Sequence, residues 1–204
     1  MTILFIWSNT ISWGDYVDRK RLILEAATKS FTLFGYKATT MDQVAKIANV
    51  GKGTIYTFYK NKEELFQEIV QSVIQEMKIK AEGTLTNNET FQERVHKVLY
   101  ELLHYRTHHQ LLIKLSQEET EMRTPAVKEM VKEIETAIIS YVEEKVKVAI
   151  EDKEIEPCNP KLTAFLLLKI YVSLVFDWEQ QNDPLSKEEI AQVLEMYLFK
   201  GLST

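Results

Sequence analysis

The chain has 204 residues, of which 45% are hydrophobic and 27% are charged, and its formal net charge is −5. An apolar share of this size supports a folded core and argues against wholesale disorder. No run approaches the roughly 20 consecutive apolar residues that a membrane-spanning helix needs, so we expect no membrane partner. The sequence has only 6 Gly and 4 Pro, which favours long helices over turn-rich β-structure, and we predict an all-α fold.

The N-terminal segment and the cysteine content both bear on location. Residues 1–14 lack the basic opening of a signal peptide, and their apolar stretch is short. We interpret residues 1–17 as a flexible or misassigned leader, with a helical arm as the alternative. Cys158 is the only cysteine, which excludes an intrachain disulfide and fits a reducing cytoplasm.

The first helix is expected over residues 18–34. Apolar and small side chains recur there at helical spacing, at Ile23, Ala26, Ala27, Ser30, Phe31 and Phe34. Gly35 follows as the residue that ends the helix.

Two short helices joined by a tight turn are expected next. Thr40 and Gln43 form a capping box at the start of the first. Asn49 lies at the turn, where a positive φ is expected and Asn tolerates it. Asn61 and Glu64 form a second capping box, which opens a longer helix reaching about Ala81. The two short helices and the turn between them have the pattern of a helix-turn-helix, whose second helix enters the major groove of DNA.

The segment Gly51–Leu65 resembles the signature of the TetR (tetracycline repressor) family of bacterial transcription regulators, roughly Val-Ser-x-Gly-Thr-Leu-Tyr-x-Tyr-Phe-x-Ser-Lys-Glu-Glu-Leu. The link at Phe34–Thr40 is also similar, and the resemblance is specific across about residues 18–70. It implies an N-terminal three-helix helix-turn-helix DNA-binding domain, residues 18–64. It also implies a C-terminal helical ligand-binding and dimerisation domain, residues 65–204. Two departures are Asn49 for the usual Gly and Gly51 for the usual Ser.

Charge is divided between these two parts. Residues 15–65 contain nine Lys or Arg and six Asp or Glu, whereas the remainder is strongly acidic. A basic N-terminal part followed by an acidic remainder suits DNA contact through the N-terminal part alone.

Specific recognition of DNA needs donors for phosphates, a slender helix tip and a few side chains that reach the bases. Thr40 presents a hydroxyl and a helix N-terminus to a phosphate, Gly51 and Gly53 keep the tip narrow, and Lys52 reaches a phosphate or a guanine. The resemblance implies that Tyr56 and Lys62 contact phosphates, whereas Tyr59 is expected in the core. The predicted DNA-binding set is Thr40, Gly51, Lys52, Gly53, Thr54, Tyr56, Thr57, Phe58 and Lys62.

The last two helices predict a homodimer. The segment 162–176 is apolar nearly all round, which requires cover on every side, and the final helix carries a sharp apolar stripe behind a Ser186–Glu189 capping box. We assign to a four-helix dimer interface Leu166, Ile170, Leu174, Ile190, Val193, Leu194, Tyr197 and Leu198. The alternative is that these residues form the core of a monomer.

The resemblance further implies a small-molecule effector held in a cavity between the helices of the body. Candidate wall residues are Tyr100, Leu103, His104, His108, Leu112, Phe165, Lys169, Tyr171, Val172 and Phe176. A lining rich in leucine and aromatic residues favours an apolar ligand, such as a fatty-acyl compound or a lipophilic drug.

His104 and His108 have the i, i+4 spacing at which two side chains can share a metal ion. No carboxylate or thiolate partner is evident beside them. We therefore expect pocket lining or a partly exposed polar surface, with no metal and no cofactor.

The sequence thus predicts a homodimeric, sequence-specific DNA-binding repressor, released from a palindromic operator by a small, apolar ligand. The alternative is a helical ligand-binding or interaction protein that does not read DNA specifically. An enzyme is not expected, because the sequence has no Gly-rich phosphate loop and no nucleophile elbow.

Overall fold

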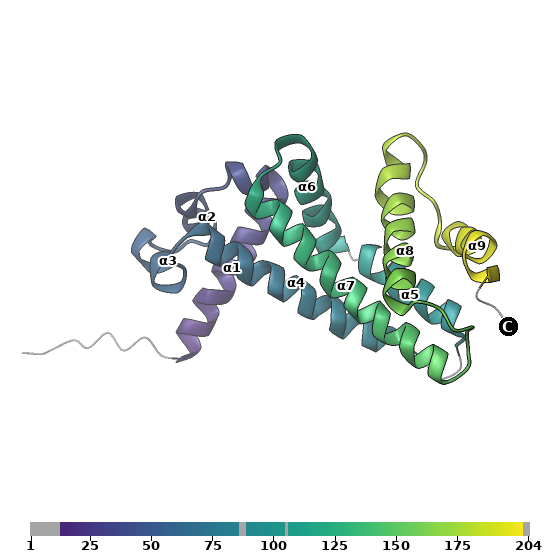
Figure 1. Cartoon of the computed structure of the whole chain (residues 1–204). Coiled ribbons are helices and arrows are strands. Elements are labelled where there is room, and N and C mark those ends of the chain that lie inside the picture. The colour runs from purple at the N-terminus through teal and green to yellow at the C-terminus, as the bar shows by residue number, and fades with distance from the viewer. Residues whose placement is uncertain (1–12, 86–88, 105, 202–204) are drawn as a thin grey trace, which may run out of the picture. The chain divides into compact units, whose positions relative to one another are not determined.

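The computed structural model describes residues 13–85, 89–104 and 106–201, with side chains left out at a few positions, among them 102–109. Every regular element in these ranges is helical, so the all-α prediction is confirmed (Figure 1). The chain divides into two compact units, Met1–Ile69 and Val70–Thr204. No helix in the described ranges is long and apolar enough to cross a membrane.

The first unit, the head, contains three helices and the start of a fourth. These are α1 (Trp13–Ala38), α2 (Met41–Ile47), α3 (Lys52–Phe58) and the first turns of α4 (Lys62–Thr84). Helix α1 begins at Trp13, five residues before the predicted start, so residues 13–17 belong to it; residues 1–12 lie outside the described ranges. A physical reason for the longer helix is that the Tyr16 ring packs on Phe58 with ring centroids 4.6 Å apart.

Gly35 breaks the helical path near the end of α1, as predicted, with φ 82° and ψ 167°. Beyond this break the Tyr36 side chain enters the core, where it is 4% exposed. Phe34, which the periodicity assigned to the buried face, is 48% exposed instead. Tyr36, which follows the break, packs on Phe31 and Phe66 in the core instead.

Three aromatic rings form the centre of the head. Phe66 lies 5.1 Å from Phe31 and 4.7 Å from Tyr36, measured between ring centroids. Beside them the Thr39 hydroxyl donates to the Gly35 carbonyl at 2.8 Å. The Ser30 hydroxyl, 3.1 Å away, therefore donates to Thr39, and both hydroxyls are satisfied although buried.

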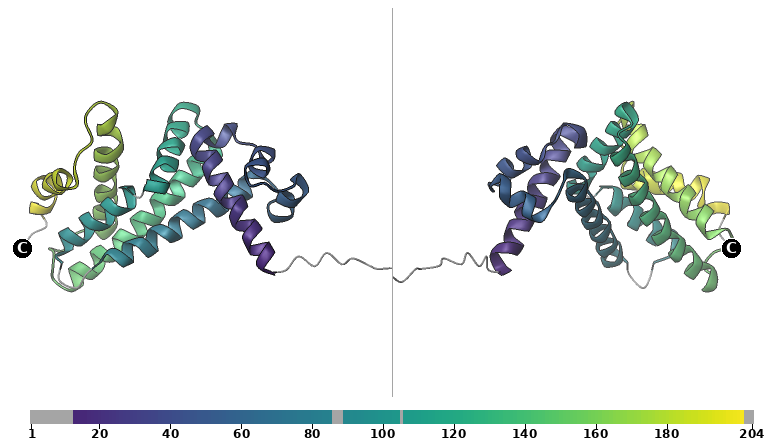
Figure 2. Two further views of the ribbon diagram at one scale, coloured as in Figure 1. Left: turned by 180° about the vertical axis from the view of Figure 1, so that it is seen from behind. Right: turned by 60° about the vertical axis from the view of Figure 1, so that its left-hand side comes forward.

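The second unit, the body, continues along α4 and contains the remaining helices. These are α5 (Phe91–His104), α6 (Arg106–Met122), α7 (Pro125–Glu151), α8 (Pro160–Val172) and α9 (Lys187–Tyr197). A π-helical turn, Ser173–Asp177, and a 3-10 turn, Trp178–Gln180, extend α8, and a second 3-10 turn, Phe199–Gly201, follows α9. Helix α7 packs against α6 and α8, and α5 contacts α8 and α9 (Figure 2).

The helix starts show which capping predictions hold. At α9 the Ser186–Glu189 box is complete, as predicted. At α2 the Thr40 hydroxyl accepts from the Gln43 amide at 3.2 Å. At α4 the Asn61 side chain accepts from the Glu64 amide, but the Glu64 carboxylate reaches back to the Lys60 amide rather than to that of Asn61.

The backbone at Gly35 generates a stability prediction. Its dihedral angles lie in a region that only glycine populates readily, so Gly35→Ala should lower the free energy of unfolding by about 1–3 kcal/mol. Gly83→Ala is the matched control, because Gly83 lies in α4 with no atom within 4 Å of an added Cβ and alanine favours helices. Denaturant unfolding at a fixed protein concentration measures both; equal stability of the two variants would contradict the assignment.

Candidate nucleic-acid interface

The turn between α2 and α3 has the geometry expected of a helix-turn-helix. Asn49 has φ 54°, so the predicted positive φ is confirmed. The Val50 amide donates to the Ala45 carbonyl at 3.0 Å, which closes the turn. Ala45 and Ile55 are buried between the helices, which fixes the angle at which α3 leaves the turn.

The tip of α3 is slender and open. Gly51 is the N-cap residue of α3 and makes no side-chain capping bond, as expected from the loss of the usual Ser. An added Cβ at Gly51 would lie at an ordinary 3.5 Å from the Thr54 hydroxyl, and one at Gly53 would meet nothing within 4 Å. The protein's own packing therefore does not require either glycine, which leaves close approach to an external surface as a reason for them.

One face of α3 is exposed while the opposite face holds the core. Ile55 and the adjoining Tyr59 are at most 1% exposed, and Tyr56 is 45% exposed. The prediction that Tyr59 belongs to the core is confirmed, and burial raises the pKa of its hydroxyl. The outward residues of α3 are Lys52, Gly53, Tyr56 and Thr57, with Thr54 half-buried beside them.

Two of these outward side chains already have partners within the head. The Lys52 ammonium lies 2.8 Å from the Asp42 carboxylate of α2, which raises the pKa of Lys52, chiefly through this hydrogen bond. The Thr57 hydroxyl donates to the Thr54 carbonyl at 2.6 Å. Thr57 therefore offers its methyl group and hydroxyl lone pairs, rather than a donor, to a partner molecule.

Lys62 and Phe58, both predicted to contact DNA, also have contacts within the head. The Lys62 ammonium donates to the carbonyls of Tyr36 at 2.8 Å and Thr39 at 3.0 Å, and it lies 4.2 Å from the Tyr36 ring centroid. It ties the start of α4 to the end of α1. Phe58 is half-buried and its ring packs on that of Tyr16.

Sequence reasoning missed the contribution of Asp42, Tyr16 and Glu63. Glu63 accepts a hydrogen bond from the Tyr36 hydroxyl at 2.8 Å, which lowers the pKa of Glu63. Spacing alone gives no signal for such contacts, because each joins residues on different helices. Asp42 alone carried a usable hint, as an acidic residue inside a basic segment.

In the body, the predicted effector-pocket residues do not converge on one described cavity. The side chains of Leu103, His104 and His108 lie outside those described, and Tyr100, Leu112, Val172 and Phe176 are half-buried. Phe165 is 42% exposed. Lys169 is bound to Glu135 of α7 at 2.5 Å.

Tyr171, in contrast, is fully buried. Its hydroxyl donates to the His96 carbonyl at 2.8 Å and contacts the His96 Nδ1 atom. Because a phenol has one proton to donate, Nδ1 is the donor in the second contact. Burial lowers the pKa of His96, which favours its neutral form. Through these contacts Tyr171 connects α8 to α5.

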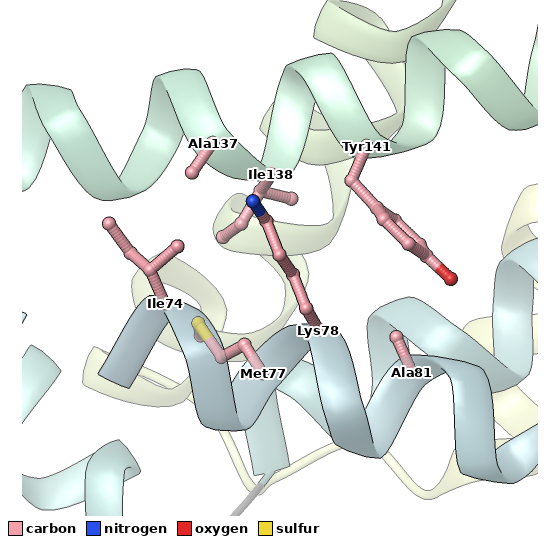
Figure 3. Close-up of a pocket in the computed structure, with 7 residues that line it drawn as sticks. All are labelled: Ile74, Met77, Lys78, Ala81, Ala137, Ile138 and Tyr141. Atoms are coloured by element: carbon pink, nitrogen blue, oxygen red, sulfur yellow. The ribbon is translucent and has the colours of Figure 1, made fainter. Parts of the chain in front are cut away.

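The described cavities in the body lie elsewhere. One of about 470 Å³ opens between α5 and α7, and it is lined by Leu85, Phe91, Arg94, Val95, Val98, Tyr141, Val142, Lys145, Val148, Asp152 and Glu154. A gap of about 10 Å³ between α4 and α7, with Tyr141 directed towards α4 (Figure 3), holds no more than about one water molecule. Among the residues that the structure describes, no three His, Cys, Asp or Glu side chains form a metal-binding group.

The predicted dimer residues separate into two groups. Ile190 and Leu194 are each 1% exposed within the single chain, so assigning them to the interface was wrong: they belong to the core of the body, where α9 contacts α5. Leu166 is 41% exposed and Tyr197 is 78% exposed. The others, Ile170, Leu174, Val193 and Leu198, are half-buried.

Comparisons with known proteins place the chain in a family. Residues 23–69 match "Bacterial regulatory proteins, tetR family", and residues 88–202 match "Tetracyclin repressor-like, C-terminal domain". The HTH-type transcriptional regulator YhgD of Bacillus subtilis is 57% identical over 187 residues, which cover 92% of this chain and 98% of that protein.

Solved structures share the fold at low sequence identity. The SmeT–triclosan complex aligns with a TM-score of 0.73 at 17% identity, over 91% of this chain and 92% of SmeT. The fatty acid degradation regulator FadR from Bacillus halodurans aligns with a TM-score of 0.69 at 17% identity, over 86% of this chain and 94% of FadR. The two family matches and the extent of the identity to YhgD show that this chain belongs to the tetR family of bacterial regulatory proteins, which are transcription regulators and not enzymes.

Proposed function

We propose that the protein is a cytoplasmic homodimeric repressor that reads a palindromic operator with α3. The observation that carries this proposal is the division of α3 into a buried face and an exposed face. The buried face holds Ile55, and the exposed face presents Lys52, Tyr56 and Thr57 around an open glycine. A helix anchored on one side and polar on the other fits the major groove, with Lys52 and Thr57 near bases and Tyr56 on a phosphate.

The first test is selection of bound sequences from a random DNA duplex pool at near-physiological salt. Enrichment of a palindrome would support specific recognition by a dimer. Recovery of unselected DNA with strong salt sensitivity would indicate backbone attraction alone and would favour the alternative of a ligand-binding or interaction protein. Transcription from the selected site in the presence and absence of the protein then separates repression from activation.

The exposed apolar side chains of α8 and α9 support the homodimer. Leu162, Phe165 and Leu166 of α8 are 41–54% exposed, and Met196 and Tyr197 of α9 are 56% and 78% exposed. Positions 162, 165 and 166 share one face of a helix. An exposed apolar stripe of this kind marks an interaction surface, and a second copy covers it symmetrically.

We further propose that the cavity between α5 and α7 takes the effector. Its 470 Å³ falls within the range of small-molecule sites. Phe91, Val95 and Val98 give it an apolar floor, and the Arg94–Glu154 and Lys145–Glu82 ion pairs lie beside it. The lining also carries four charged side chains, so an apolar ligand with a polar group fits it, and triclosan in SmeT and the fatty acid link of FadR suggest the chemistry. A ligand that binds the non-DNA-binding state better lowers operator affinity by its differential affinity.

Tyr56 and Lys62 should separate a DNA contact from a structural one. Tyr56→Phe removes one hydroxyl and should weaken binding about two- to tenfold on every duplex, without loss of stability. Lys62→Ala removes the bonds to Tyr36 and Thr39 and should lower the free energy of unfolding by about 1.5–3 kcal/mol as well as DNA affinity. Fluorescence anisotropy and denaturant unfolding measure the two effects; a Lys62→Ala protein of unchanged stability would contradict the structural role.

The interface proposal predicts the effect of a buried charge. Leu166→Glu or Tyr197→Glu should raise the dimer dissociation constant by at least about tenfold, because each places an unpaired carboxylate in the interface. Ile79→Glu is the control, since Ile79 is 63% exposed on α4. Sedimentation velocity across a concentration series measures the change, and dimers of unaltered affinity in both variants would refute this interface.

Filling the α5–α7 cavity should abolish the effector response. Val148 lines the cavity and is 43% exposed, so Val148→Trp can block it without overpacking the core. With triclosan and palmitic acid as probes, at least one should raise the melting temperature of the wild type and lower its operator affinity, and the variant should lose both effects while its ligand-free DNA binding stays unchanged. Ile79→Trp, outside the cavity, should behave as the wild type; a full response in Val148→Trp would exclude this cavity.

A further inference from the structure

The segment that holds α2 and α3 contains one carboxylate, that of Asp42. Asp42 is the only Asp or Glu between Glu25 and Glu63, a segment that also holds Lys29, Lys37, Lys46, Lys52, Lys60 and Lys62. It lies in the first turn of α2, beside the tip of the exposed α3. A negative charge at this place repels the phosphates that the neighbouring lysines attract.

Asp42 is bound to the first residue of the recognition helix. Its Oδ2 atom lies 2.8 Å from the Lys52 Nζ atom, and the two side chains are 53% and 67% exposed. An ion pair this exposed contributes little to folding. Its effect is on Lys52. In the protein without DNA, the pair holds the flexible ammonium group beside α2, and the Asp42 carboxylate offsets its positive charge.

An ammonium group has three donors, and Asp42 uses one of them. Two donors remain, enough for the O6 and N7 acceptors of a guanine edge. A lysine held in this way can engage a guanine that lies within its reach, but it is restrained from swinging to whichever phosphate is nearest. The Asp42 carboxylate also repels DNA phosphates. It therefore disfavours complexes with DNA sequences that offer Lys52 no guanine to bind.

We propose that Asp42 is a specificity-determining residue, which restrains Lys52 for recognition of a guanine and suppresses its indiscriminate contact with phosphates. This rests on the proposed function, since it assigns a role within the same DNA interface. The chemistry required of the DNA is one guanine in each half-site within reach of Lys52. Asp42 thereby lowers total affinity somewhat while it raises discrimination.

The test compares the affinity of the selected operator with that of a scrambled duplex over a salt series. Asp42→Asn keeps the size of the side chain and removes its charge. It should strengthen scrambled-duplex binding about two- to fivefold and reduce the operator-to-scrambled ratio by about three- to tenfold. The salt dependence of scrambled-duplex binding should steepen by about one released counterion.

Two further variants separate restraint from simple charge removal. Asp18→Asn makes the same charge change at an exposed position of α1 and should leave the ratio unchanged. Asp42→Glu keeps a carboxylate that the flexible Lys52 can follow, and it should retain most of the discrimination. Thermal unfolding of each variant confirms that it is folded.

The decisive measurement is a double-mutant cycle with Lys52→Ala. If Asp42 acts through Lys52, Asp42→Asn should leave the ratio unchanged once Lys52 is absent. An equal fall of the ratio in the Lys52→Ala background would overturn the proposal, as would identical effects of Asp42→Asn and Asp18→Asn. A wild-type protein that prefers no sequence would instead refute the proposed function itself.

Discussion

The attachment of α4 to the end of α1 is the constraint on which the head depends. Helices α2 and α3 have only seven residues each, too short to be stable alone. They depend on packing: α2 contacts α1 and α3, and Val44, Ala45 and Ile55 are buried. The end of α1 is in turn fixed to α4, because Lys62 binds the carbonyls of Tyr36 and Thr39 and the Tyr36 ring packs on Phe66. The hydrogen bond from the Tyr36 hydroxyl to Glu63 adds a further contact between α1 and α4. We therefore expect the loss of any of these contacts to loosen the junction between α1 and α4.

This junction also shows what could and could not be predicted from the sequence. The head's helices, the positive φ of Asn49 and the break at Gly35 follow from local spacing and from the conformational preferences of single residues. The position of Lys62 does not, because its partners lie more than twenty residues earlier in the chain. From the sequence, a lysine at the start of a helix can equally well contact a phosphate or bind carbonyls of its own chain. Only the tertiary structure shows the second kind of contact.

The body was harder to predict for a related reason. Its helices could be assigned from apolar periodicity, but an apolar stripe does not state which neighbour covers it. Ile190 and Leu194 pack inside the chain, while Tyr197 of the same helix stays exposed. Likewise Tyr171 and Phe165 of α8 were both predicted to line the pocket. Tyr171 is fully buried and bound to His96, whereas Phe165 is 42% exposed. Apolar periodicity therefore identified only some of the exposed residues of α8 and α9. It gave no indication of the cavity between α5 and α7.

The distribution of charge in the head follows the same physical logic as its packing. Cations alone would give a protein that binds any DNA, since phosphate attraction carries no sequence information. Two features of the head oppose that outcome: Lys62 is occupied by backbone carbonyls, and Lys52 is paired with Asp42. On the proposed function, the net positive charge of the segment attracts DNA, while these internal partners limit how many lysines can contact its phosphates. In the proposed complex, discrimination then falls to the few outward groups of α3, on the helix that the buried Ile55 and Tyr59 anchor.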